Sequence, residues 1–137
     1  MSDLPDTNGE VAREWIQHAR TYYSMAIGAQ GMAGNKVAVR SLVSAAVMAI
    51  KAVYIGHETY FPRTHDTKEL IDGCPDRSIY LLLDGYPTEF IEEFSLNYLA
   101  PYIRERPVPD NEFATCRGFA EQVLSWASAA VETLSGG

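Results

Sequence analysis

The chain has 137 residues, a formal net charge of −7 and an apolar content of 47%, which fits one domain with enough apolar side chains for a core. Its 21% of charged residues are too few for a disordered chain, and its negative charge argues against binding to duplex DNA or to an anionic membrane. Residues 1–65 carry a net charge of +1 and residues 66–137 one of −8, so a local basic spot could contact RNA while the second half repels it.

The two cysteines, Cys74 and Cys116, form no CxxC motif. We expect them to be free, buried or half-buried thiols in a reducing cytosol. Residues 1–8 lack the basic region and apolar stretch of a secretory signal. The most apolar run, residues 42–55, contains a lysine and is too short and too polar to span a bilayer. We therefore predict a soluble cytoplasmic protein.

Residues 10–29 are predicted to form the first helix, because apolar side chains recur there at steps of three and four. Thr7 and Glu10 have the spacing of a capping box. Three glycines at positions 28, 31 and 34 are expected to end the helix in a flexible loop. A second helix is predicted over residues 36–56, with Asn35 as its N-cap. Its apolar residues surround it almost completely, which is typical of a central helix.

Two short helices are expected next. Thr64 is a candidate N-cap for a helix over residues 65–71, which Gly73 and Pro75 would end. Asp76 is a candidate start for another short helix, which the Asp84–Gly85 pair would close.

Two further long helices are predicted at residues 88–103 and 111–134. Pro101 would kink the end of the first, and Asp110 is a candidate N-cap for the second. No segment alternates with the period of a strand. The expected fold is an all-α, up-and-down bundle of four long helices plus one or two short ones. It forms a single domain over residues 10–134, between flexible ends at residues 1–9 and 135–137.

Three features follow one another along the chain. They are an alanine-rich second helix that ends in residues 49–53, AIKAV, the segment PRTHDTKEL at residues 62–70, and Tyr102 followed by an Arg/Pro loop and a long final helix. Together they resemble the HEPN domain family (higher eukaryotes and prokaryotes nucleotide-binding). The pair Trp15–Ile16 also resembles the first helix of that family. The resemblance covers residues 10–134.

The resemblance implies an up-and-down helical bundle that often forms a homodimer. It also implies a frequent association with a minimal nucleotidyltransferase, in toxin–antitoxin pairs or related systems. Active members of the family are metal-independent ribonucleases. They use an Arg that is followed, after four to six residues, by a His at the start of the last helix. Two copies meet across the dimer in a cleft that holds the phosphodiester.

The sequence departs from the family at this motif. Arg104 and Arg106 are present, but no His follows, and Asn111 stands where the His would be after Arg106. An Asn can hold a phosphate or a 2′-hydroxyl by hydrogen bonds, but it cannot transfer a proton near neutral pH. Loss of one general acid–base group costs roughly 10²–10⁴-fold in rate. We therefore predict no efficient ribonuclease activity.

Arg104, Arg106 and Asn111 remain candidate ligand-binding residues. A guanidinium beside the amides of a helix N-terminus can bind an anion such as phosphate. The alternative is that the two arginines form ion pairs in solvent with nearby acids such as Glu105 or Glu112.

His65 and Lys51 are secondary candidates for ligand binding. His65 is followed by Asp66, a carboxylate that could orient the imidazole, although a structural link between the short helix and its neighbour is the favoured explanation of the pair. Lys51 lies among apolar residues, where it could extend to solvent, pair with an acid, or contact a nucleotide or a partner. His57, Glu58, His65 and Asp66 lack the spacing of a helical metal site, so neither a metal nor a cofactor is predicted.

The main hypothesis is therefore an HEPN-like binding protein without ribonuclease activity. It would form a homodimer and associate with a nucleotidyltransferase partner, a nucleotide or an RNA phosphate. One alternative is a ribonuclease that uses Arg104 or Arg106 with a non-standard acid–base group. A second alternative is a helical module whose only role is association with another protein.

Overall fold

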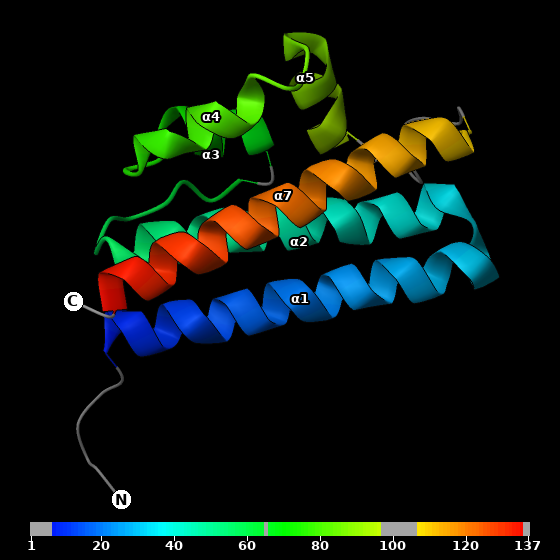
Figure 1. The fold of residues 1–137 in the computed structure, drawn as a ribbon. Coiled ribbons are helices and arrows are strands. Elements are labelled where there is room, and N and C mark those ends of the chain that lie inside the picture. Colours follow the sequence, from blue (N-terminus) through cyan, green and yellow to red (C-terminus); the bar gives the residue numbers. More distant parts are fainter. Residues whose placement is uncertain (1–6, 65, 97–106, 136–137) are drawn as a thin grey trace, which may run out of the picture.

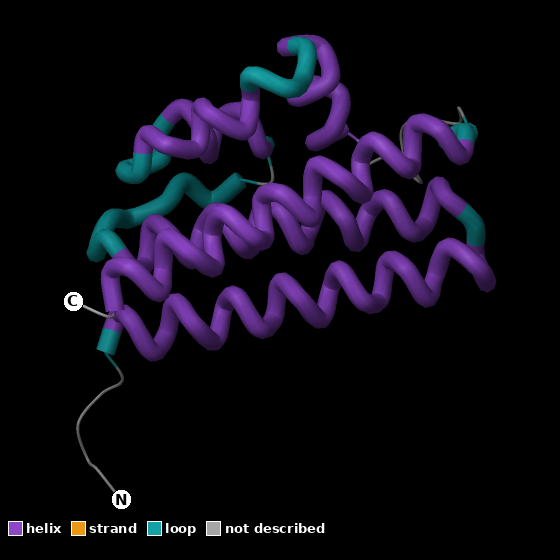
Figure 2. Tube along the Cα trace, viewed as in Figure 1, coloured by secondary structure: helices purple, strands orange, loops and turns teal. Residues whose placement is uncertain are grey.

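Three long helices form the body of the molecule. The computed structural model describes residues 7–64, 66–96 and 107–135, and these ranges contain helices, turns and loops but no strand (Figure 2). The long helices are α1 (Asn8–Ala33), α2 (Asn35–Gly56) and α7 (Asp110–Ser135). They lie side by side, and α2 contacts both α1 and α7 (Figure 1). The prediction of an all-α bundle is confirmed.

The described residues between α2 and α7 form four short elements. They are α3 (Thr67–Asp72), the 3₁₀ helix η1 (Arg77–Ile79), α4 (Tyr80–Leu83) and α5 (Thr88–Leu96). Figure 1 shows them on the side of the bundle away from α1, where α3 contacts α2 and α5. The predicted helix over residues 88–103 is confirmed up to Leu96. Its remainder, with Pro101, lies outside the described residues.

The first helix begins and ends beyond its predicted bounds. Its N-terminal cap is confirmed, because the Thr7 hydroxyl accepts a 3.1 Å hydrogen bond from the Glu10 amide. The predicted glycine loop is wrong, since α1 continues through Gly28 and Gly31 as far as Ala33. A helical glycine costs only about 1 kcal/mol, and the packing of α1 on α2 offsets this cost. Only Gly34, with a φ of 88°, turns the chain.

The central helix is α2, as predicted. Twelve of its side chains are buried, five of them alanines, which let the neighbouring helices approach closely. Its 22 residues are long and apolar enough to cross a membrane, but 67% of its most apolar window is buried inside the bundle. The predicted N-cap is wrong, because Gly34 occupies that position and Asn35 is the first helical residue, with no side-chain cap bond. The Asn35 side chain is engaged elsewhere.

The start of the first short helix also differs from the prediction. Asp66 is the N-cap rather than Thr64, since its carboxylate accepts the amides of Lys68 and Glu69 at 3.0 and 3.4 Å. The Thr64 hydroxyl instead accepts the Asp66 amide at 2.9 Å. The second predicted start is confirmed, because the Asp76 carboxylate accepts the amide of Ser78 at 3.0 Å.

The core is one cluster of buried side chains from α1, α2, α3, α5 and α7. Phe94 of α5 and Phe119 of α7 are fully buried, with ring centroids 4.9 Å apart in an edge-to-face arrangement. Both cysteines are buried and neither forms a disulfide, as predicted. Burial raises the pKa of Cys74 to about 11, so this thiol stays protonated and unreactive near neutral pH.

Candidate functional site

The start of α7 is fixed to the turn between α1 and α2. The Asn35 side-chain amide donates hydrogen bonds to the Val108 carbonyl at 2.9 Å and to the Asp110 carboxylate at 2.8 Å. Gln30 in turn donates to the Asn35 side-chain oxygen at 2.9 Å. We call this group, together with Asn111, the α7 corner. It holds the chain segment that enters α7 against the beginning of α2.

Packing supports the same corner. Val108 and Phe113 are buried, and the Phe113 amide donates a 2.9 Å hydrogen bond to the Pro109 carbonyl, which begins the helix. The helix starts at Asp110, one residue earlier than predicted. Asp110 is therefore the first helical residue rather than the cap, and its carboxylate accepts from Asn35.

Asn111 is exposed at the first turn of α7. Its carbonyl accepts a 3.1 Å hydrogen bond from the Thr115 hydroxyl. Asp110 and Glu112 stand on either side of it in the sequence, and both carboxylates interact favourably with the positive end of the helix dipole. An anion at this helix end would therefore depend on added positive charge. The predicted sources, Arg104 and Arg106, lie outside the described residues, and Arg106 precedes Val108 by two positions in the sequence.

Lys51 is not part of the α7 corner. It follows Asn35 by 16 residues along α2, which corresponds to about 24 Å of helix. Its ammonium nitrogen lies 5.0 Å from the centre of the Phe61 ring, a cation–π contact, and partial burial lowers its pKa. The structure thus gives Lys51 a local packing role and does not bring it to Asn111.

The described histidines also lie far from Asn111. His57 follows α2 and lines a cavity with Thr133, near the opposite end of α7, about 33 Å of helix beyond Asn111. His18 lies on α1 near Arg20, which donates a 2.9 Å hydrogen bond to Ser128, about 26 Å along α7 from Asn111. Neither could transfer a proton at the corner. The third histidine, His65, lies outside the described residues.

The described residues contain no group of three His, Cys, Asp or Glu side chains close enough to share a metal ion. His57, Glu58 and Asp66 therefore form no such group among themselves.

A second polar cluster, across α1 and α7, was not predicted. The Tyr23 hydroxyl donates to the Glu121 carboxylate, and the Arg117 guanidinium donates to Tyr23 at 3.0 Å and to Glu121 at 3.1 Å. The hydrogen bond from Tyr23 lowers the pKa of Glu121. Arg117 and Glu121 have the spacing of a helical ion pair, which the sequence could have indicated, but Tyr23 lies 94 positions before Arg117.

Comparison with known proteins gives one match. The model of the HEPN domain family matches residues 12–130 of the chain. This range contains α2, all the short helices and most of α1 and α7, including the α7 corner. No curated protein and no solved structure gave a significant match.

Proposed function

The chain belongs to the HEPN domain family, and from this we propose that it is a binding protein without efficient ribonuclease activity. It holds a nucleotide or an RNA phosphate at the α7 corner and works with a minimal nucleotidyltransferase in a toxin–antitoxin-like or related system. The observation that carries the proposal is Asn111, an exposed amide at the first turn of α7, at the spacing after Arg106 where the family's ribonucleases have a His.

The proposed chemistry at the corner is recognition without proton transfer. The Asn111 side chain can donate to a phosphate oxygen and accept from a 2′-hydroxyl. Asp110 and Glu112 make the described part of this helix end acidic, so a bound phosphate requires the positive charge of Arg104 or Arg106. The hydrogen bonds of Asn35 support this role, because they hold Val108, two positions after Arg106 in the sequence.

We further propose a homodimer in which the two α7 corners face each other across a two-fold axis. A phosphate would then receive guanidinium groups from both copies. Cys74 and Cys116 are buried thiols outside any disulfide, which supports placement in a reducing compartment such as the cytoplasm.

Binding of a labelled structured RNA to the purified protein, followed by fluorescence anisotropy at low salt, tests the corner. We expect binding without cleavage, and a Kd at least about tenfold weaker in Arg106→Ala, as for the loss of a charge-assisted hydrogen bond. Arg63→Ala, which removes an exposed arginine from another loop, is the matched control and should bind like the wild type. Equal binding by both variants would contradict the proposed site. Cleavage that disappears in Arg106→Ala would instead establish the ribonuclease alternative.

Co-expression with a minimal nucleotidyltransferase, followed by affinity purification and light scattering, tests the association. We expect a dimer of the chain alone and a larger complex with the partner. A protein that stays monomeric at high micromolar concentration would contradict the dimer. If the dimer retains no nucleotidyltransferase and binds no RNA, the alternative that stands is a helical module whose only role is association with another protein.

A further inference from the structure

An apolar helix without a full packing partner lies beside α7. The four residues of α4 are a tyrosine and three consecutive leucines, and none of them is buried. Leu81 is 75% exposed, whereas Tyr80, Leu82 and Leu83 are half-buried against the core. Leu81 thus adds an open apolar side chain to a partly covered apolar surface, which is typical of an interaction surface.

Two adjoining cavities continue this apolar surface along α7. The first, about 680 Å³, lies between α4 and α7, and the second, about 520 Å³, lies between the segment before α4 and the last turns of α7. Trp126 lines both. Together they form one groove, the α4–α7 groove, which extends from Glu121 to Leu134, about 20 Å of helix.

Several polar groups around the groove are already hydrogen-bonded to one another. The Trp126 indole donates to the Ser78 hydroxyl at 2.9 Å, and the Tyr86 hydroxyl donates to the Gln122 side chain at 3.1 Å. These bonds fix the Trp126 ring between the two cavities. The groove therefore presents an ordered apolar floor to an incoming molecule.

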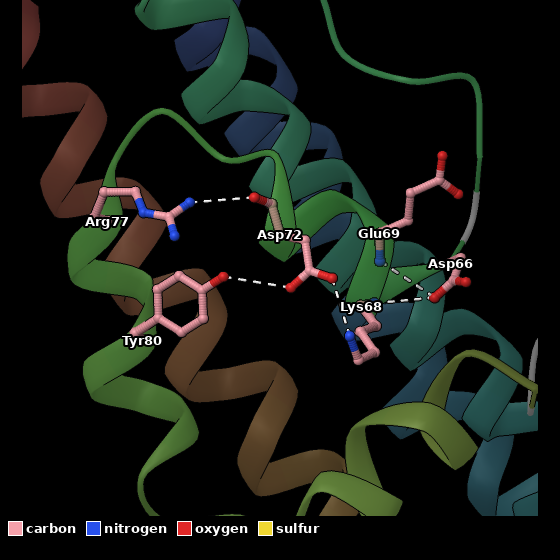
Figure 3. A network of polar contacts seen from close by, with 6 residues as sticks. All are labelled: Asp66, Lys68, Glu69, Asp72, Arg77 and Tyr80. Carbon is pink, nitrogen blue, oxygen red and sulfur yellow. Dashed lines mark hydrogen bonds and ion pairs between the residues drawn. The ribbon is translucent and has the colours of Figure 1, made fainter.

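The surroundings of the groove are acidic. Residues 66–96 contain eight acidic residues and only two basic ones, Lys68 and Arg77. Figure 3 shows that both bases turn toward Asp72: Lys68 pairs with its carboxylate at 3.0 Å, and Arg77 donates to its carbonyl at 3.2 Å. The Arg77 guanidinium also lies 4.6 Å from the Tyr80 ring.

The rim of the groove consequently carries an excess of negative charge. Asp76 and Glu121 line its two cavities, and Asp84 directly follows α4. Glu121 is paired with Arg117 at 3.1 Å, which leaves Asp76 and Asp84 as the acids that a basic partner would meet. Among the described lining residues of the two cavities, Arg77 is the only Lys or Arg, and His57 is the only His.

We propose that the α4–α7 groove binds a basic amphipathic helix of a protein partner. Apolar side chains on one face of that helix would cover Leu81 and Trp126, while its Lys and Arg residues would face the acidic rim. A length of 20 Å corresponds to about 13 helical residues.

This groove is separate from the α7 corner. Trp126 follows Asn111 by 15 residues, or about 22 Å along α7. The inference therefore does not depend on RNA or nucleotide binding at the corner, and a dimer formed through the corner would leave the groove open.

A pair of designed peptides tests the groove. One labelled 14-residue peptide has leucines at helical spacing with lysines elsewhere, and the other has the same leucines with glutamates. Titrated by anisotropy with the full chain, the lysine peptide should bind at least tenfold more tightly than the glutamate peptide. In the Trp15→Phe variant, which keeps Trp126 as the only tryptophan, binding should shift the Trp126 emission to shorter wavelength.

Two matched variants locate the binding. Leu81→Ser should weaken the lysine peptide at least tenfold, whereas Met32→Ser, which alters an exposed residue near the other end of the bundle, should change it less than twofold. Equal effects of the two variants, or no preference for lysine, would overturn the proposal. Self-association that Leu81→Ser abolishes would assign the groove to a second copy instead. If the wild-type protein binds the lysine peptide but no RNA, only the proposed function is contradicted, because Leu81 lies outside the corner.

Discussion

The side chain of Asn35 donates a 2.9 Å hydrogen bond to the carbonyl of Val108, 73 positions later in the chain. Val108 stands between two prolines, which have no amide hydrogen to donate. The segment that enters α7 therefore depends on a side chain for part of its attachment. One amide group thus links the first turn of the central helix to the start of the last one.

Replacement of Asn35 should loosen this attachment. We expect Asn35→Ala to lower the free energy of unfolding by about 1–2 kcal/mol, since it leaves the Val108 carbonyl without this donor. Asn35→Asp should lower it further, because it places a second carboxylate beside Asp110. Urea denaturation measures both changes. Asn111→Ala, at the same end of the bundle but exposed, is the control, and an equal effect there would argue against the special role of Asn35.

The glycines around the first turn should respond to alanine in opposite ways. Gly28 and Gly31 are helical and have open space around the position of a Cβ atom, so alanine at either should stabilise the fold by about 0.5–1 kcal/mol. Gly34 has a φ of 88°, and alanine there should cost about 1–2 kcal/mol. Thermal unfolding of the three variants tests the assignment. Destabilisation by alanine at positions 28 and 31 would indicate that α1 ends earlier.

The long helices could be predicted because their buried apolar side chains recur at helical spacing within each helix. The apolar spacing of α1, α2 and α7 is a local signal, and so is the cap that Thr7 provides. The end of α1 could not be predicted from Gly28 and Gly31, because helix–helix packing outweighs a small local propensity. The same limit applies to Asn35, whose local environment favours a cap while the acceptors of its side-chain amide lie more than 70 positions away.

The candidate site was predictable in part. The apolar spacing of the last helix predicted that Asn111 lies at its start, and Asn111 stands in the first turn of α7; its role in ligand binding stays a prediction. The surroundings of Lys51 were not predictable, since Phe61 approaches it from a loop that has no periodic pattern. Tyr23 and Glu121 meet only because α1 and α7 pack side by side, which no pattern within either helix indicates.

Alkaline pH should weaken the fold through Tyr54. Its hydroxyl donates a 2.6 Å hydrogen bond to the Leu70 carbonyl, and burial raises its pKa from the usual value near 10 to about 12. The folded state therefore holds this proton more tightly than the unfolded chain. This contribution to stability is complete below about pH 10 and is lost as the pH rises through about 12.

Denaturation of the wild type and of Tyr54→Phe between pH 8 and 11.5 tests this dependence. At pH 8, Tyr54→Phe should cost about 1 kcal/mol, because it removes the donor to Leu70. Its stability should then fall less steeply with pH than that of the wild type. Tyr22→Phe, which alters a more exposed tyrosine, should follow the wild type. Parallel slopes for all three proteins would contradict the role of Tyr54.

Asn111→His should create ribonuclease activity if only the proton carrier is missing from the corner. We expect cleavage of structured RNA at least 10²-fold faster than by the wild type, with a dependence on pH near 6–7. Asn111→Gln, which cannot titrate, is the control and should stay inactive. The double variant with Arg106→Ala should lose the gained activity. No gain in Asn111→His would show that the corner lacks more than its His.

The single-residue connection at Gly34 shapes how the chain reaches its native state. Because α1 and α2 are neighbours in the sequence, their hairpin can assemble quickly from local contacts. The face of α2 that receives α7 stays uncovered until a segment of more than 50 residues has been closed into a loop. During that interval the most apolar helix of the protein is half open to solvent, and this is the stage at which the nascent chain is most exposed to aggregation and to capture by chaperones.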